Sequence, residues 1–166
     1  EHDLNRRMTV SAVPTDPSYA AQWHLHRHLQ NAQYDSRSST RCEDAWQLLG
    51  GFGSSDVVVG VTDDGCKLDH SDFDSPGKFA NWGYFVGTRL VKRDDLDADA
   101  SKMHESGSDH GTACAGVIGA ETDSARCVGA APGCRLLPVK WQSDGPYLPI
   151  SDSKFLDVLN WVANQV

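Results

Sequence analysis

Asp63 and His110 have side chains that can transfer protons, and each lies next to a predicted strand or helix at a position where functional groups are often found. Asp63 directly follows an apolar, β-branched run at 57–62, and His110 opens a run of small residues at 111–120. In open α/β sheets, functional groups collect at the carboxyl ends of strands. A helix N-terminus disfavours a charged imidazolium, so His110 should stay neutral and able to accept a proton.

A carboxylate beside such a histidine would orient the ring and stabilise it once it becomes charged. We therefore interpret Asp63 and His110 as a cooperating acid–base pair. Taken alone, Asp63-Asp64-Gly65 is also good turn chemistry, and His110 is also compatible with a capping or packing role.

Positioning this pair requires alternating strands and helices. Apolar runs predict strands over 56–62, 78–86 and 135–141, and helical patterns predict helices over 40–50, 110–119 and 151–166. The run at 56–62 does not alternate, which indicates a strand buried on both faces of a parallel sheet. This order is typical of an α/β fold with a doubly wound, mostly parallel sheet. The last helix should lead to a further strand, so we expect the fold to be incomplete in this chain.

The ends and faces of two helices can also be predicted. Thr40 and Glu43 match a capping box, and Gly50-Gly51 would end that helix. In the last helix, the apolar residues of one face are Phe155, Leu159, Val162 and Val166. Residues 1–40 are polar and contain turn signals, so we predict an N-terminal arm over 1–40 and a second unit over 41–166.

Composition excludes several classes of protein. The net charge of −8 over 166 residues argues against a nucleic-acid-binding surface. No apolar run is long enough for a transmembrane helix, and the first residues, Glu-His-Asp, show neither an initiator Met nor a signal peptide. The five cysteines form no C-x-x-C pair, which argues against a zinc ribbon or a thioredoxin-like site. Their odd number indicates a free thiol or a partner outside this segment, and it is compatible with a secreted protein.

Two motifs carry a resemblance to the subtilisin-like serine peptidases. Residues 57–65, followed by 69–73, resemble the aspartate motif of that family, and 109–116 resemble its histidine motif, in the same order along the chain. The resemblance covers about residues 14–166, and it implies that Asp63 and His110 are catalytic and that the substrate is a polypeptide. The nucleophilic serine and the oxyanion-hole asparagine are expected beyond Val166, in the remainder of the catalytic domain. The isolated chain is therefore expected to be inactive, and a secreted or periplasmic location is expected.

Two residues are similar to the kexin-like branch of this family, whose members often cut after basic residues. Asp64 stands where bacterial subtilisins usually have Ser or Thr, and the resemblance implies that it binds a basic residue of the substrate. A turn carboxylate is the equally open alternative. Cys114 lies in the kexin-like version of the histidine motif, and we interpret it as a buried packing thiol. Cys127 resembles a cysteine whose disulfide partner lies downstream, with Cys127–Cys134 as the local alternative.

A calcium ion is also implied by the resemblance, because the family binds one between its N-terminal arm and the loop that follows the histidine helix. Calcium accepts six to eight oxygen ligands in irregular geometry. A solvated acidic loop is the alternative, and Arg126 departs from the family pattern. The implied ligands are the side chains of Asp16, Asp72 and Asp123 and the backbone carbonyls near Glu121, Ala125 and Cys127.

Two further groups of residues and the chain as a whole have alternative interpretations. The acidic run at 94–99 lacks the glycine and the final glutamate of an EF-hand, so we interpret it as a solvated loop within an insertion near the cleft. His24, His26 and His28 are interpreted as surface and packing residues and not as metal ligands. For the whole chain, the alternative to a peptidase is a non-catalytic pseudo-peptidase or a calcium-stabilised binding module.

Overall fold

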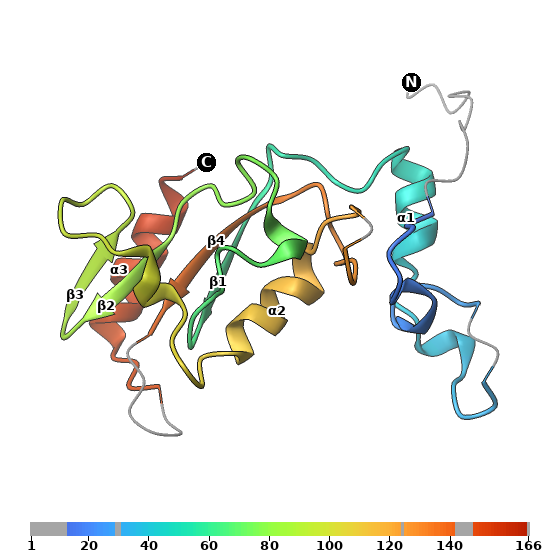
Figure 1. The fold of residues 1–166 in the computed structure, drawn as a ribbon, viewed down its shortest axis with the longest axis horizontal. Helices are drawn as coiled ribbons and strands as arrows, with labels where there is room; N and C mark the ends of the chain where they lie inside the picture. Colours follow the sequence, from blue (N-terminus) through green and yellow to red (C-terminus); the bar gives the residue numbers. More distant parts are fainter. Residues whose placement is uncertain (1–12, 29–30, 124, 142–147, 166) are drawn as a thin grey trace.

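The computed structural model describes residues 13–28, 31–123, 125–141 and 148–165 (Figure 1). Residues 1–12, 29 and 30 of the predicted arm and Val166, predicted to belong to the last helix, lie outside these ranges. One four-stranded sheet has the order β1-β4-β2-β3. Its strands are β1 Val58–Asp63, β2 Gly83–Val86, β3 Arg89–Lys92 and β4 Arg135–Lys140. Strand β4 runs parallel to β1 and β2, and β3 runs antiparallel to β2, so the predicted fold class is confirmed.

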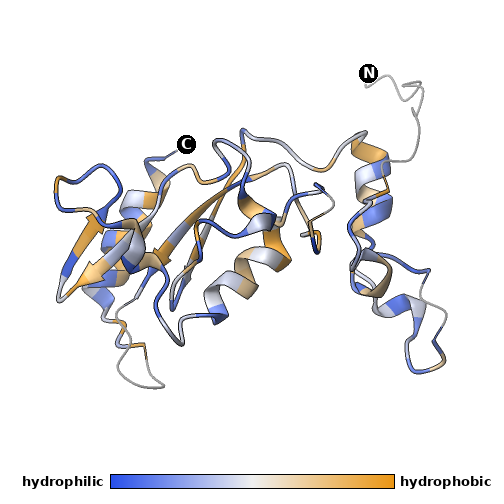
Figure 2. Ribbon diagram, in the orientation of Figure 1, coloured by the Kyte–Doolittle hydropathy of each residue, from blue (hydrophilic) through white to orange (hydrophobic). Residues whose placement is uncertain are grey.

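Two helices cover opposite faces of the sheet (Figure 1). Helix α2, His110–Gly119, packs through Ala115 on the face that contains Leu136 of β4. Helix α3, Asp152–Ala163, packs through Val158 on the other face, against Leu137. Because successive side chains of a strand point to opposite faces, β4 supplies both clusters, and the sheet is wound on both sides. The apolar colours of Figure 2 accordingly gather on the strands.

The same alternation directs Asp63 towards α2. Val59 and Val61 of β1 belong to the cluster on the α2 face. A Cβ on Gly60 would instead meet Val162 of α3 at 3.3 Å. Asp63 lies two residues after Val61, so its side chain leaves the strand on the α2 face. Its place at the last position of β1 brings the carboxylate to the first turn of that helix.

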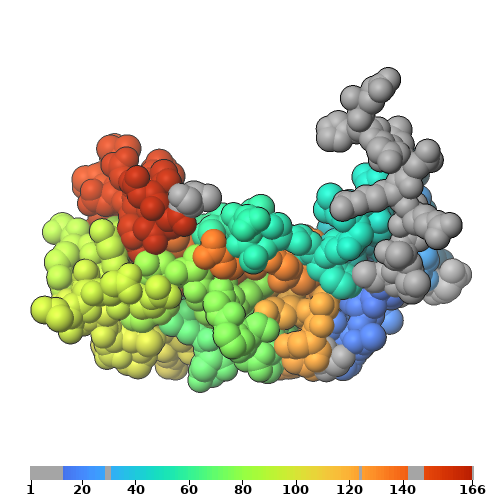
Figure 3. All heavy atoms as spheres, turned by 90° about the horizontal axis from the view of Figure 1, so that it is seen from above, coloured from blue at the N-terminus to red at the C-terminus, as the bar shows by residue number. Residues whose placement is uncertain are grey.

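The N-terminal segment, which comprises the described residues up to Leu49, packs at one end of the sheet (Figure 1). It contacts the chain that follows α2. Helix α1, Cys42–Leu49, contributes Trp46, whose indole N–H donates to the Ala130 carbonyl at 2.9 Å. Gln22 and Val128 exchange two hydrogen bonds, at 2.8 and 3.0 Å. Figure 3 shows this N-terminal segment, in blue and cyan, beside the orange segment that contains residue 130.

Several local predictions are wrong. The helix predicted to start with a capping box has Arg41 at its N-cap with a φ of 61°, while Thr40 donates to the His24 carbonyl. Glu43 is buried and accepts a hydrogen bond from the Tyr19 hydroxyl at 2.6 Å. Strand β1 lies at an edge of the described sheet and leaves Gly60 exposed, so burial on both faces is found for β4 and not for β1.

The predicted face of α3 is wrong for Phe155 and Leu159, whereas Val162 packs against the core as predicted. The buried residues of this helix are Lys154, Val158 and Trp161, whereas Phe155 and Leu159 are 45% and 48% exposed. Strand β3 and a short 3-10 helix at Ala100–Met103, on either side of the acidic run at 94–99, were not predicted.

At Gly111, helix α2 approaches the end of β1 so closely that no side chain would fit between them. A Cβ there would lie 2.1 Å from the Gly65 carbonyl oxygen and 2.7 Å from the Asp63 Cβ. These neighbours are backbone or the base of a side chain, so they cannot simply rotate away. A glycine at this position therefore permits the contact that the site requires.

We expect Gly111→Ala to destabilise the fold by about 1–3 kcal/mol, because the added methyl overpacks the contact. Gly116 of the same helix is the matched control. A Cβ at Gly116 meets nothing within 4 Å, so Gly116→Ala should stabilise by about 0.5–1 kcal/mol through helix propensity. Chemical denaturation of the two variants measures both free energies of unfolding. Equal effects of the two substitutions would contradict the tight contact at Gly111.

Candidate active site

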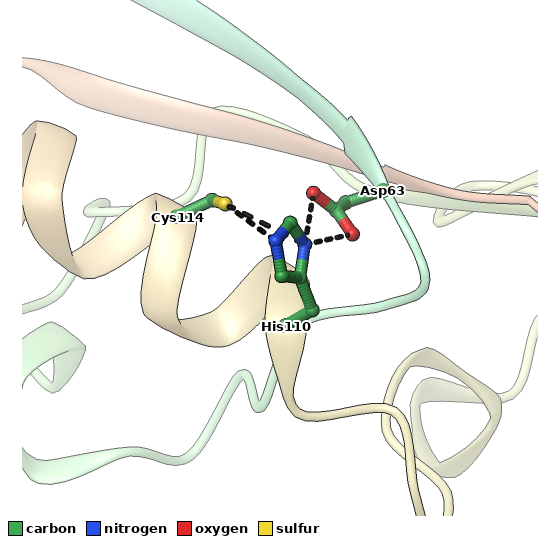
Figure 4. Close-up of side chains that lie close together, drawn as sticks. All are labelled: Asp63, His110 and Cys114. Carbon is green, nitrogen blue, oxygen red and sulfur yellow. Dashed lines mark hydrogen bonds and ion pairs between the residues drawn. The ribbon is translucent and has the colours of Figure 1, made fainter. Parts of the chain in front are cut away.

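The structure brings together the two residues predicted to be catalytic (Figure 4). His110 is the first residue of α2, and its Nδ1 lies 2.9 Å from Oδ1 and 3.0 Å from Oδ2 of Asp63. The two residues are 47 positions apart in sequence, so the contact depends on the packing of α2 against β1. With its proton on Nδ1, the ring donates to the carboxylate and leaves Nε2 as the acceptor.

Asp64 fixes the start of α2 through the backbone. Its carboxylate accepts hydrogen bonds from the amides of His110, at 3.2 Å, and Gly111, at 2.7 Å. These amides belong to the first helical turn, whose N–H groups have no partner inside the helix. Consecutive carboxylates of one turn therefore hold the same histidine, Asp63 by its ring and Asp64 by its backbone. The structure supports the turn-carboxylate interpretation of Asp64, and its substrate-binding role stays a prediction.

The pair has the electrostatics of an acid–base couple. Burial tends to raise the pKa of Asp63, but hydrogen bonds from the His110 ring and the Asp64 amide outweigh it and hold that pKa below its usual value. The hydrogen bond and charge of Asp63 raise the pKa of His110. Asp63 thus favours the charged form of the imidazole. The His110 side chain is 75% exposed and that of Asp63 only 15%, so the ring is open to a reacting partner.

Cys114 belongs to the same cluster, and its contact with His110 was not predicted from the sequence. Its Sγ lies 3.7 Å from Nδ1 and 3.9 Å from Nε2 of His110 (Figure 4). The thiol is partly buried and packs against the hydrophobic cluster on the α2 face, as predicted for a packing residue, although it is less buried than predicted. The spacing of four residues along a helix is the signal that would have placed the thiol and the imidazole on one face.

Three of the predicted calcium ligands lie together where the arm meets the loop after α2. Asp16 and Asp72 are 4% and 2% exposed. An Asp72 oxygen accepts a hydrogen bond from the Cys127 thiol at 3.1 Å. Burial, followed by Asp72 and then Asp16, raises the pKa of that thiol to about 12. Nearby buried carboxylates repel each other, and a divalent cation would offset that cost, so their chemistry fits calcium.

Asp123, the third predicted side-chain ligand, lies in a neighbouring group together with Glu121, which was predicted to contribute its carbonyl. Oxygen atoms of Glu121, Asp123 and Asp74 are within 4.8 Å of one another. Asp74 was not predicted, although it follows the short 3-10 helix that contains Asp72. Ala125 lies in the same loop, where its amide donates to Asp123 Oδ1 at 2.8 Å. The structure thus places the predicted residues on adjoining segments without gathering all of them around one point.

The remaining predictions can be compared with individual contacts. All five cysteines are unpaired in the structure, so the local Cys127–Cys134 disulfide is not present. His26 is buried and stacks on His28, as expected for packing residues. In the acidic run, Asp97 pairs with Arg89 and Asp99 caps the 3-10 helix at Ala100–Met103. None of the helices in the described part of the chain has the length and hydropathy of a transmembrane span.

The raised pKa of His110 can be tested by following each imidazole by NMR as the pH changes. We expect His110 to titrate above the usual value of about 6.5, and Asp63→Asn to lower its pKa. The charged pair stabilises the fold below the usual pKa of histidine, and this contribution is lost as pH rises through the raised value. His24 serves as the internal control, since burial and His26 lower its pKa. An unchanged His110 titration in Asp63→Asn would show that the pair does not interact.

The sequence of this chain is similar to those of known proteases. The sequence profile of the Subtilase family, Peptidase_S8, matches residues 54–160. A calcium-dependent protease of Nostoc sp. is 29% identical over 76% of this chain and 17% of its own length. The halolysin-like extracellular serine protease Nep of Natrialba magadii is 28% identical over 92% of this chain and 24% of its own.

Mouse proprotein convertase subtilisin/kexin type 4 is 28% identical over 95% of this chain and 22% of its own length. The chain thus spans less than a quarter of each of these relatives. The profile match covers most of the chain and includes both Asp63 and His110. This chain belongs to the subtilase family of serine proteases.

Proposed function

We propose that this chain supplies the aspartate and the histidine of a Ser-His-Asp triad that hydrolyses peptide bonds of polypeptides. The observation that carries the proposal is the bond of 2.9 Å between His110 Nδ1 and the Asp63 carboxylate. The serine would come from a segment of the gene product beyond these 166 residues. These 166 residues alone are therefore expected to be inactive, because a triad without its nucleophile has no acyl acceptor.

In the proposed reaction, His110 carries one proton in each of two successive steps. As the serine oxygen attacks the peptide carbonyl, Nε2 accepts the serine proton, and it then gives that proton to the leaving amine. Water cleaves the acyl-enzyme by the same route, with Nε2 again accepting and returning a proton. Asp63 stays ionised and stabilises the imidazolium through Nδ1–H. Its lowered pKa and the raised pKa of His110 both favour this charge state.

The domain boundary and the location belong to the same proposal. Residues 1–40 would form an arm on the unit over 41–166, which is supported by the hydrogen bonds that join Gln22 to Val128. The relative from Natrialba magadii is named as an extracellular protease, and we infer a location outside the cytoplasm for this protein. An extended substrate would pair through its backbone with an exposed strand of the sheet.

Calcium is the proposed cofactor, held where the arm meets the loop after α2. Two relatives are named as calcium-dependent proteases. Asp16 and Asp72 would supply side-chain oxygens, and Asp123, which lies in the neighbouring group with Glu121 and Asp74, would add one on a shift of its loop. Bound there, the ion would supply positive charge that ties the arm to the loop. The proposed role is stability, since these residues surround the end of α2 remote from His110.

The triad can be tested by covalent labelling of the full-length gene product with a fluorophosphonate, which reacts with an activated serine. We expect the wild type to be labelled. Asp63→Asn should lower kcat for peptide hydrolysis by about 10⁴-fold, because the wrong tautomer of His110 would be favoured. Asp69→Asn is the matched control. Its carboxylate lies on the same stretch of chain, pairs with Lys67 and is 85% exposed. If the wild type is not labelled, the protein is a non-catalytic relative and the proposal is wrong.

The calcium proposal predicts a stability that depends on the ion. Saturating calcium at about 100 times its Kd should stabilise the fold by about 2.7 kcal/mol relative to chelated protein. Thermal unfolding with calcium and with a chelator measures the difference. Asp72→Asn should abolish most of it. Asp157→Asn, on α3 at the other end of the sheet, should leave the difference unchanged. A calcium response that survives in Asp72→Asn would place the ion elsewhere.

A further inference from the structure

A recess opens beside α2, between that helix, residues 67–73 and the N-terminal segment, and we call it the α2 pocket. Its volume is about 500 Å³. Small-molecule sites typically have volumes of about 300–1,000 Å³, so the α2 pocket is large enough for such a ligand. Asp63, His110 and Cys114 do not line it. The α2 pocket is therefore formed by other residues than the candidate active site.

Part of the wall of the α2 pocket is apolar. Phe73, which is 3% exposed, lines it together with Ala113, Gly116 and Val117 of α2. A Cβ at Gly116 would meet nothing within 4 Å, so open space lies directly over this turn of the helix. Val117 is 57% exposed. A ligand with an apolar body would remove this surface from water, which favours its binding.

The walls of the α2 pocket are held together by hydrogen bonds. The Lys67 amide donates to Thr112 Oγ1 at 3.0 Å, which joins the segment 67–73 to α2. The Ser18 amide donates to the Arg126 carbonyl at 2.9 Å, which joins the N-terminal segment to the loop after α2. The pocket thus exists without a ligand, and binding would require little ordering of the chain.

Most charged side chains that line the α2 pocket are engaged by other groups. Lys67 Nζ lies 2.9 Å from Asp69, and His104 Nε2 lies 3.0 Å from Asp109. Asp72 is 2% exposed and accepts hydrogen bonds from an amide and a thiol of the loop after α2. These contacts leave few charges available to a ligand.

Arg126 is the exception. Within the described ranges, its guanidinium has no hydrogen-bond or ion-pair partner. His70 adds a donor, because its Nδ1 accepts the Asp72 amide at 3.2 Å and its proton is therefore on Nε2. A guanidinium is always charged, and its planar donors match the oxygens of an anionic group. The polar wall of the α2 pocket thus offers positive charge and N–H donors.

We propose that the α2 pocket binds a free amphiphilic anion, with an apolar body and one carboxylate or sulfonate head group. The body would lie on Phe73 and on the turn of α2 at Gly116. The head group would pair with Arg126, and His70 would donate a hydrogen bond to it. Charge complementarity selects an anion over a neutral or cationic amphiphile. Binding transfers no proton or electron, and it is independent of the proposed peptidase activity.

The fluorescent probe anilinonaphthalene sulfonate, added to the full-length gene product, tests the α2 pocket. Arg126→Gln should weaken one equivalent of probe binding by at least about tenfold, as loss of a charged hydrogen-bond donor requires. Gly116→Leu should weaken the same equivalent, because its side chain would fill the open space over α2. Arg93→Gln is the matched control and should leave the affinity unchanged, since Arg93 follows β3 and pairs with Asp94.

Excess calcium is present throughout, so that weaker calcium binding by a variant is not mistaken for weaker probe binding. Circular dichroism checks that each variant is folded. Equal probe affinities of the wild type, Arg126→Gln and Gly116→Leu would overturn the proposal.

Competition measures the demand for a negative charge. Octanesulfonate should displace the probe from the wild type at a concentration at least about tenfold lower than octanol does, because only the anion can pair with the guanidinium. Arg126→Gln should remove this difference, and equal displacement by both compounds in the wild type would contradict an anion site. Binding that depends on Arg126 in a product that fluorophosphonate does not label would support the α2 pocket and contradict only the peptidase. A labelled product without such binding would contradict the α2 pocket alone.

Discussion

The contact between the first turn of α2 and the carboxyl end of β1 is the constraint on which the site depends. Gly111 permits it, since any larger residue would meet the Gly65 carbonyl and Asp63. Asp64 secures it by accepting two backbone amides of the helix. With backbone held against backbone, the Asp63 carboxylate and the His110 ring have little freedom to separate. The hydrogen bond between them therefore results from packing as much as from charge.

Sequence reasoning succeeded where one local pattern determines an element. The β-branched run before Asp63, the small residues after His110 and the apolar run at 135–141 each predicted an element that the structure contains. Strand β3 was missed because only Leu90 and Val91 are apolar among charged neighbours. The face of α3 was misassigned because Lys154 is buried: its long stem packs inward and its Nζ lies 5.2 Å from the centre of the Phe85 ring.

The candidate site could be predicted only in part. Family motifs placed Asp63 and His110 together, because their order and flanking residues were present in the sequence. The orientation of Cys114 against the imidazole required coordinates, since helical spacing gives a shared face but not a rotamer. The capping of α2 by Asp64 depends on a tertiary contact across 46 residues of chain. Helix α1 shows the same limit, because Glu43 matched a helix cap in sequence yet accepts a hydrogen bond from Tyr19 in the structure.

The docking of the N-terminal segment has a consequence for the order in which parts of the molecule fold. Gln22 and Val128 are separated by 106 positions, and their two hydrogen bonds close a long loop of chain. Contacts of such high sequence separation are entropically expensive to form and slow folding. This segment should therefore settle late, after the sheet is assembled. Its amides should also exchange with solvent sooner than those of β4, because peripheral units open at lower free energy than central strands.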